Sequence, residues 1–517
     1  MPASHQTFLH LRKTVVRFGV SLLVSSLGLT GQTQRGLGNR ILHTMPLAVP
    51  RGVSAVKLVL STQADVSGAF ALPTKAQRGQ YVYNMLTTTA QQAQASVLQA
   101  VSQMGLIGTG FYIADFVLVQ APPGQVITTT QLQTLQARSD VVSIESVGPF
   151  NPNIPPVSAQ AISSLPPGRG IEPNLQFINA PAVWSQGAQG QGITIGVVDT
   201  GVQWDHPLLK SHYRGTSASQ VIHDYNWWDA VHATMTGGTN SCGVNSAVPC
   251  DDLGHGTHIA GAAVGGNGQD YQIGVAPQAQ FIACRDMDRG YASTGSTFEE
   301  CMQFMLAPWD LNGQNPDYTK APDIVVHPYH CYVAGQNCVD DPVMHMVYWN
   351  LYAAGITSVV AAEDSGPVCG NSTLAWPQTY PIAMVTGALD YDPNSGSPLS
   401  AIASYSASGP GAPPSAIFRT DISTPGTHIL SAVPGGNVAY NSGTSVAASQ
   451  LAGALALILS ARPSLQGRPE QMWRLIGTVP PLPTAPAACG SPDAWPNFTY
   501  GWGSLDVSAM LSMANAN

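Results

Sequence analysis

Three segments of this chain carry residues that together could activate a hydroxyl group. Asp199 closes the apolar run "ITIGVVDT", His255 lies in "GHGTHIAG", and Ser445 lies in "NSGTSVAAS". A serine hydroxyl is a weak nucleophile until a base removes its proton, and a histidine oriented by a carboxylate does this near neutral pH. The residue types therefore predict nucleophilic catalysis, with Asp199 orienting the base, His255 as general base and then acid, and Ser445 as nucleophile.

The residues around each candidate indicate how it is positioned. Asp199 ends a strand and is followed by a tight turn, while Gly254 and Gly256 leave room around the imidazole of His255. Ser445 begins a helix that is apolar on all sides and therefore buried. The start of that helix offers a positive dipole end and a free backbone N–H to a developing negative charge. Each motif alone also fits an ordinary turn or helix cap, so it is their joint occurrence that favours catalysis.

The strands and helices that must carry these residues are predicted from about Ile171 onward. Apolar runs alternate there with helical segments, as in "GITIGVVDT", "PDIVV", "GITSVVAA" and "PIAMVTGAL". Continuous apolar strands predict a mainly parallel sheet covered by helices on both faces, which is an α/β fold. In such sheets chemistry gathers at the carboxyl ends of the strands.

A small unit without cysteine is expected over residues 79–150. The runs "QYVYNML", "FYIADFVLV" and "VVSIE" predict strands, and "AQQAQASVLQAVSQM" and "TTQLQTLQARS" predict helices. The order approximates β-α-β-β-α-β, a small α+β ferredoxin-like arrangement. The proline-rich stretch 151–170 that follows is predicted to be an exposed linker.

The first residues predict export. Basic residues precede the apolar run "FGVSLLVSSLGL", which fits a signal peptide over residues 1–31 and is too short to span a bilayer. Residues 32–78 are then a further N-terminal pro-segment, and the protein is expected to be secreted with no stable membrane anchor. All eight cysteines lie in the second half, which suggests disulfides. Cys242–Cys250 and Cys331–Cys338 are close enough to close short loops, but the connectivity stays open.

Composition excludes some partners. Charged residues make up 9% of the chain and the net charge is −9, so the basic patch that nucleic acid requires is not expected. Gly (52) and Pro (40) are plentiful, which indicates a protein rich in loops. None of the cysteine spacings forms a convincing zinc pattern, and no cofactor is predicted.

The chain resembles the subtilases, the subtilisin family of serine endopeptidases, from "NLQFINAPAVW" to "YGWGSLDV". The order Asp, His, Ser is that of subtilisin. The phrases "YNWWDAV", "PCDDLGHGTH" and "TPGTHILSAVPGG" are most similar to the bacillopeptidase F-like branch. The resemblance implies a three-layer αβα catalytic domain over 171–517 and hydrolysis of proteins or peptides through an acyl-enzyme. It also implies a removable propeptide, here 79–150, that chaperones folding and blocks the cleft. A monomer without a metal site is expected.

One stretch departs from this family in the cleft itself. In subtilases the strand matching "SVVAAEDSGP" ends Gly-Asn, and the asparagine amide donates to the oxyanion; here Glu363 and Asp364 stand instead. An ionised aspartate can only accept hydrogen bonds, whereas a protonated one can donate. Burial or a neighbouring carboxylate raises the pKa of an aspartate. Asp364 is therefore expected to serve as the oxyanion donor when it is protonated.

Two further departures keep other functions open. "VHPYH" (Val326–His330) replaces the branch's Asn-Asn-Ser-Trp-Gly in the strand that pairs with substrate, and Pro328 has no N–H for that pairing. Ser449 and Gln450 replace the Pro and His that follow the family's nucleophile. One alternative is a catalytically impaired, protease-shaped protein that binds peptides or proteins. Another is a transpeptidase that passes the acyl group to an amine.

Overall fold

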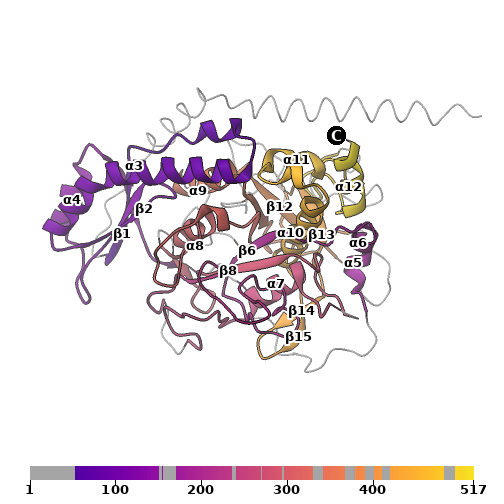
Figure 1. Cartoon of the computed structure of the whole chain (residues 1–517). Coiled ribbons are helices and arrows are strands. Elements are labelled where there is room, and N and C mark those ends of the chain that lie inside the picture. The colour runs from indigo at the N-terminus through magenta and orange to yellow at the C-terminus, as the bar shows by residue number, and fades with distance from the viewer. Residues whose placement is uncertain are drawn as a thin grey trace, which may run out of the picture.

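The computed structural model describes residues 53–150, 154, 170–235, 240–268, 271–293, 296–329, 342–366, 378, 380–390, 401–409, 420–481 and 495–516. The predicted signal peptide and most of the predicted linker lie outside these residues. Figure 1 shows the described chain as a small N-terminal unit seated on a larger α/β body.

A seven-stranded sheet forms the centre of the α/β body. Its order is β13-β12-β11-β10-β6-β8-β7, and every neighbouring pair is parallel. The strands are β6 (Thr194–Asp199), β7 (Trp227–Asp229), β8 (Gln280–Arg285), β10 (Ile324–His327), β11 (Thr357–Ala361), β12 (Ala383–Leu389) and β13 (Ile422–Pro425). The predicted parallel sheet of continuous apolar strands is therefore confirmed.

Helices cover both faces of this sheet. Successive residues of a strand point to opposite sides, so a continuous apolar strand presents apolar side chains to both layers of helices. Val197, Val326 and Val359 pack with α7 (His255–Val264) and α10 (Thr444–Ala461) in one apolar cluster. Their neighbours Val198, Val325 and Val360 pack with α8 (Thr297–Leu306) and α9 (Pro342–Ala353) in another. Both faces of these three strands are thus buried, and the three-layer αβα fold is confirmed.

The remaining elements of the body lie around these layers. α10 is long and apolar enough to cross a membrane, but 89% of it is buried within the protein as its core helix. The other elements are α5 (Pro173–Phe177), α6 (Ala180–Trp184), β9 (Ala292–Ser293), η2 (Tyr318–Lys320), β14 (Ile429–Val433), β15 (Asn437–Asn441), η3 (Pro463–Leu465), α11 (Pro469–Ile476) and α12 (Val507–Ala516).

The N-terminal unit is a four-stranded antiparallel sheet with two helices against it. Its sheet order is β2-β3-β1-β4, and the chain order is β-α-β-β-α-β, as predicted. The elements are β1 (Ala55–Leu60), η1 (Ser67–Ala71), α3 (Lys75–Gln103), β2 (Ile107–Phe111), β3 (Phe116–Gln120), α4 (Thr129–Gln136) and β4 (Val141–Ser146).

The strand expected at "QYVYNML" is wrong, because this segment belongs to the long helix α3. Val82, Leu86 and Ala90 are buried at four-residue spacing, so the helical pattern of the following segment extends back through it. Thr74 caps the helix by accepting a hydrogen bond from the Gln77 N–H. The first strand is β1, which places part of the segment 32–78 in the same folded unit as residues 79–150.

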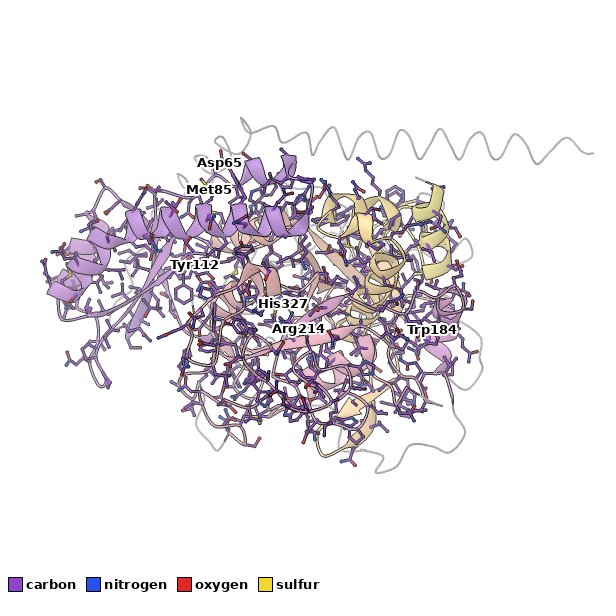
Figure 2. All side chains as sticks on the ribbon, in the orientation of Figure 1. Asp65, Met85, Tyr112, Trp184, Arg214 and His327 are labelled. Atoms are coloured by element: carbon purple, nitrogen blue, oxygen red, sulfur yellow. A yellow bond between two sulfur atoms is a disulfide. The ribbon has the colours of Figure 1, made fainter. Side chains whose placement is uncertain are left out.

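The N-terminal unit shares a hydrophobic core with α8 and α9. Val82, Leu86 and Phe116 pack in the same cluster as Phe298 and Val347 of the α/β body. Tyr112 lies at this junction (Figure 2), where the Tyr112 and Ile113 N–H groups both donate to the Gln303 side-chain oxygen. The unit is therefore docked by apolar burial as well as by hydrogen bonds.

Candidate active site

The structure brings together Asp199, His255 and Ser445 from three separate elements. Asp199 is the last residue of β6, His255 the first of α7, and Ser445 lies in the first turn of α10. His255 Nδ1 lies 2.8 and 2.9 Å from the two carboxylate oxygens of Asp199. His255 Nε2 lies 3.1 Å from Ser445 Oγ. The imidazole is thus within proton-transfer reach of the hydroxyl while a carboxylate holds its other nitrogen.

The electrostatics of His255 favour its protonated form. Burial by itself lowers the pKa of this imidazole, but the charge and hydrogen bond of Asp199 and the nearby Asp251 and Asp364 raise it above the usual value. His255 is 1% exposed and Asp199 is fully buried, so little solvent screens their interaction. An imidazolium formed by accepting the Ser445 proton would be stabilised at this position.

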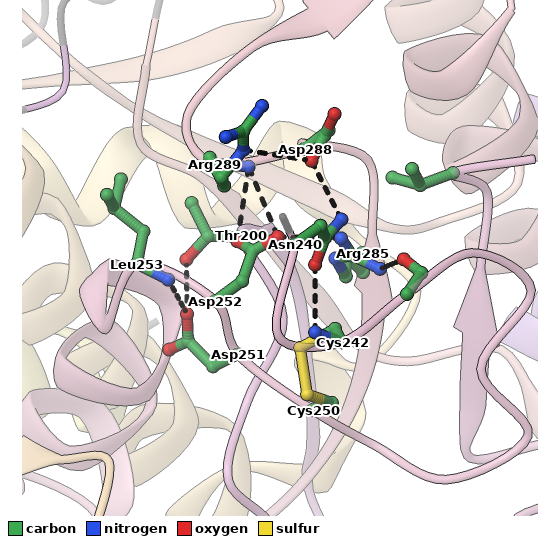
Figure 3. Close-up of polar contacts among 12 residues, drawn as sticks. Thr200, Asn240, Cys242, Cys250, Asp251, Asp252, Leu253, Arg285, Asp288 and Arg289 are labelled. Carbon is green, nitrogen blue, oxygen red and sulfur yellow. Dashed lines mark hydrogen bonds and ion pairs between the residues drawn. A yellow bond between two sulfur atoms is a disulfide. The ribbon is translucent and has the colours of Figure 1, made fainter. Parts of the chain in front are cut away.

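Asp251 holds the first turn of α7, which carries His255. One of its oxygens accepts hydrogen bonds from the Gly254 N–H at 2.7 Å and the Thr200 hydroxyl at 2.9 Å. The other accepts from the Thr257 N–H at 2.9 Å. Thr200, whose contact with Asp251 is drawn in Figure 3, in turn donates its N–H to Asp199 at 2.7 Å. One network therefore supports both Asp199 and the helix start.

A disulfide and a buried arginine support the loop that precedes Asp251. Cys242–Cys250 closes this loop, as its spacing suggested, while Cys331–Cys338 lies outside the described residues. Arg285, which is fully buried and is labelled with Asp252 in Figure 3, pairs with Asp252 at 2.7 Å. It also pairs with Asp229 at 3.1 Å. The loop reaching α7 is therefore fixed at both of its ends.

Asp364 lies beside Ser445, on the segment that follows β11. Its Oδ1 accepts hydrogen bonds from the Thr444 N–H and hydroxyl, both at 2.9 Å. Burial raises the pKa of the Asp364 carboxyl, whereas the Thr444 donors and His255 act against this rise. Asp364 is exposed as a whole residue, yet the protein atoms around its carboxyl group still disfavour the ionised form.

Two backbone features shape this side of the site. Glu363 adopts a φ of +92°, a conformation that favours glycine. Glu363 therefore keeps the backbone conformation that suits the glycine of the Gly-Asn pair in subtilases. A side chain on Gly443 would place its first carbon 2.9 Å from Ser445 Oγ and 3.0 Å from Asp364 Oδ2. Gly443 thus keeps open the space shared by the hydroxyl and the carboxyl.

The altered strand "VHPYH" leaves the sheet before its proline. β10 ends at His327, and the Tyr329 hydroxyl donates a hydrogen bond to the Asp286 carboxyl group. His330 lies outside the described residues. A separate backbone pairing joins β5 (Pro149–Phe150), just after the N-terminal unit, to β9 in antiparallel register.

Ser449 and Gln450 are occupied by contacts away from the nucleophile. The Ser449 hydroxyl donates to the Val446 carbonyl at 2.7 Å within its own helix. Gln450 accepts a hydrogen bond from Asn174 at 2.9 Å and donates to the Pro425 carbonyl. Both side chains are fully buried, so they fill the space under α10 rather than the cleft.

No group of three or more His, Cys, Asp or Glu side chains within the described ranges could hold a metal ion. His206 and His258 instead bond to backbone carbonyls, at 2.8 Å to Asn437 and 3.2 Å to Ile429 respectively. Both histidines are buried, and these contacts hold their rings against the backbone.

Comparison with known proteins agrees with this geometry. The model of the subtilase family matches residues 190–503. The chain belongs to the subtilase family. It is 30% identical over 458 residues to bacillopeptidase F of Bacillus subtilis, covering 86% of this chain but 29% of that protein. It is 30% identical over 335 residues to subtilisin E of the same species, covering 65% of this chain and 70% of the relative.

A third relative carries a different cellular description. The chain is 28% identical over 340 residues to the "Intracellular serine protease" of Paenibacillus polymyxa, covering 64% of this chain and 85% of the relative. The predicted membership of the subtilisin-like serine proteases, with similarity to bacillopeptidase F, is therefore confirmed.

Sequence reasoning missed several residues that shape this subtilase site. Thr444 and Asp251 stand inside motifs already recognised, "GTS" and "PCDDLGHGTH", but their partners Asp364 and Thr200 are distant in sequence. The second described disulfide, Cys284–Cys301, joins β8 to α8 across 17 residues. The even cysteine count was the available signal for it, and that count cannot specify a pairing.

Proposed function

We propose that this chain is a secreted subtilisin-like serine endopeptidase, made as a pro-enzyme. The supporting observation is the continuous contact from Asp199 through His255 to Ser445, with 2.8 and 3.1 Å between the bonded atoms. Ser445 Oγ attacks the carbonyl carbon of a peptide bond while His255 Nε2 takes its proton. His255 then gives this proton to the leaving amine, and water releases the acyl group by the same route.

The negative charge of the tetrahedral intermediate requires donors next to Ser445. The Ser445 N–H at the start of α10 is one, and protonated Asp364 is the other. His255 must be neutral to act as base, so turnover rises as the pH passes its pKa. Asp364 must be protonated, so turnover falls as the pH passes the pKa of that carboxyl. Burial raises the pKa of Asp364, which widens the pH range in which both conditions hold, whereas Asp199, Asp251 and Asp364 outweigh burial at His255, raise the pKa of His255 and narrow that range.

The N-terminal unit acts as the chain's own inhibitor and folding chaperone. Its docking through the core shared with α8 and α9 supports this role. The antiparallel pairing of β5 with β9 supports it further, because a segment that pairs as a strand with the α/β body is bound in the way that an extended peptide is bound. Removal of the unit by cleavage within 151–170 would then expose the cleft.

Export is the remaining part of the proposal. The apolar run within 1–31 and the two disulfides support an oxidising, extracellular setting, because disulfides are rare in reducing compartments. Sequencing the N-terminus of protein collected from outside the producing cells tests this. Recovery of the full chain inside the cells, with free thiols at Cys242 and Cys250, would contradict it.

A non-catalytic binding protein is the second candidate. Glu363 and Asp364 in the oxyanion segment and Pro328 after β10 favour it, because they alter two sides of one cleft. The full burial of Ser449 adds no support for the transpeptidase alternative.

A fluorophosphonate probe separates the enzyme from the binding protein. The processed chain is incubated with the probe at several pH values, and the adduct is located by mass spectrometry. Adduct on Ser445 that is lost in Ser445→Ala is expected of the endopeptidase. Absence of adduct at every pH would favour the binding protein. Added amine acceptors during peptide cleavage test for acyl transfer.

A further inference from the structure

Thr444 determines which oxygen of Asp364 can carry a proton. Its N–H and its hydroxyl both lie 2.9 Å from Asp364 Oδ1. The Glu363 N–H lies 3.1 Å from Thr444 Oγ1 and can only donate. The hydroxyl oxygen is thus an acceptor from Glu363, and its single hydrogen is directed to Asp364. Oδ1 therefore receives two hydrogen bonds.

The second oxygen of Asp364 faces the nucleophile. A Cβ atom added to Gly443 would lie 3.0 Å from Asp364 Oδ2, 2.9 Å from Ser445 Oγ and 3.7 Å from Ser445 N. Oδ2 therefore shares an open space with the Ser445 hydroxyl and N–H. A hydrogen on Oδ2 would point toward the place where an oxyanion forms, whereas a hydrogen on Oδ1 would meet the two Thr444 donors.

We propose that Thr444 is a positioning residue that confines the proton of Asp364 to Oδ2, beside Ser445. This inference rests on the proposed function, because a donor at Oδ2 matters only if Asp364 serves the oxyanion. Thr444 is 1% exposed and lies between Asp364 and the Glu363 backbone, so water has little access to its hydroxyl, although Asp364 itself is exposed. An amide side chain always carries its donor hydrogens on the same atom. In Asp364 the Thr444 hydroxyl fixes instead which oxygen carries the hydrogen.

The groups around Asp364 act on its charge in opposite directions. Burial disfavours the carboxylate and raises the pKa of Asp364, while the Thr444 donors and His255 on α7 lower it. The carboxyl of Glu363 is adjacent in the chain, and the phenol of Tyr405 interacts with the Asp364 charge while bonding to Thr427 at 2.9 Å. Removing the Thr444 hydroxyl takes away one donor to the carboxylate, so the pKa of Asp364 rises.

The test compares Thr444→Val with Thr444→Ser in processed protein, using kcat/KM for a peptide substrate from acid to alkaline pH. In Thr444→Val the alkaline limb moves up by about 0.4 to 1 pH unit, the size expected for one lost hydrogen bond. Turnover on the acid side of that limb falls at least threefold, because the proton is no longer confined to Oδ2. Thr444→Ser keeps the hydroxyl and restores both properties.

Asp364→Asn supplies the second background, because an amide does not titrate. There Thr444→Val produces no shift of a limb. If Thr444→Val in the otherwise unsubstituted protein loses turnover equally at every pH and its alkaline limb does not move, the positioning role of Thr444 is wrong. Asp364 could then still serve as the oxyanion donor. If Asp364→Asn itself leaves the pH profile unchanged, the oxyanion role of Asp364 fails instead. Thermal unfolding of each variant shows that folding is intact.

Discussion

The guanidinium group of Arg78 on α3 forms two hydrogen bonds with the carboxylate of Glu470 on α11, 2.9 and 3.1 Å long. Arg78 is 1% exposed, although it belongs to the N-terminal unit and its partner to the α/β body. Lys75 makes a second contact of this kind with Asp323, at 2.7 Å. Lys57, 2% exposed, lies 3.8 Å from Glu299 on α8. Basic groups of the N-terminal unit thus meet acidic groups of the body.

Glu470→Gln is expected to weaken retention of the N-terminal unit. The substitution leaves the buried Arg78 without its countercharge, which costs about 1 to 2 kcal/mol because solvent reaches part of Glu470. The measurement is gel filtration of protein cleaved within 151–170, at decreasing protein concentration. The N-terminal fragment should separate from the variant at roughly five- to thirtyfold higher concentration than from the unsubstituted protein.

Arg138→Gln is the matched control for this prediction. Arg138 pairs with Asp140 at 2.6 Å, inside the N-terminal unit. The substitution therefore removes an ion pair that does not cross the interface. Its fragment should be retained like that of the unsubstituted protein. Equal retention of the fragment in Glu470→Gln would show that the apolar core alone holds the unit.

Asp115→Asn is expected to stabilise the chain at neutral pH. Asp115 is 3% exposed, and burial raises its pKa to about 6, although the hydrogen bond from Gln94 acts against this. Its Oδ1 accepts from Gln94 at 2.6 Å, while Oδ2 has no hydrogen-bond partner among the described residues. A raised pKa means that the folded state prefers the protonated acid, so stability is full below about pH 4 and falls as the pH rises through 6.

Thermal unfolding at pH 4 and pH 7.5 measures this effect. Asp115→Asn should raise the free energy of unfolding at pH 7.5 by up to about 3 kcal/mol, which corresponds to a shift of about two pKa units. The gain should vanish near pH 4. Asp140→Asn provides the opposite sign, because hydrogen bonds from Arg138 lower the pKa of Asp140 and make its carboxylate stabilising. A gain of equal size at both pH values would exclude titration of Asp115 as its cause.

The α/β body could be predicted because its signals are local and strong. Strands such as β11 and β12 are largely apolar and buried on both faces, which is visible in a run of a few residues. The N-terminal unit was harder, because "QYVYNML" has residues that favour strands but continues a helical spacing. The buried positions Val82, Leu86 and Ala90 show that packing against the unit's sheet decided the outcome.

The contacts that tune the site could not be read from the sequence. Thr444 and Asp364 are 80 residues apart, and Thr200 and Asp251 are 51 apart. Nothing in either local segment specifies these pairs, since they exist only after the sheet brings its strand ends together. The Glu-Asp substitution itself was visible, but the left-handed conformation of Glu363 and the two donors to Asp364 required coordinates.

Asp364→Asn is expected to raise turnover at alkaline pH. An amide donates a hydrogen bond at every pH, whereas the carboxyl group of Asp364 donates only when protonated. Loss of one oxyanion donor costs about 100- to 1000-fold in turnover, a figure measured in subtilisin. The alkaline decline of kcat should therefore disappear, with a gain of up to about 100-fold above the limb. Ser445→Ala in the same background should abolish all cleavage and serves as the control for contaminating proteases.

Asp251→Asn is expected to move the acid limb of activity to lower pH. Asp251 contributes to raising the pKa of His255, so removing its charge lets the imidazole become neutral at lower pH. An asparagine keeps one acceptor oxygen, but its NH2 group cannot accept the hydrogen bonds that the other carboxylate oxygen receives from Thr257, which costs about 1 to 3 kcal/mol of stability. Asp205→Asn, at an exposed residue six positions after Asp199, should leave both the acid limb and the stability unchanged. An unmoved acid limb in Asp251→Asn, at intact folding, would show that Asp251 acts on α7 without influencing the charge of His255.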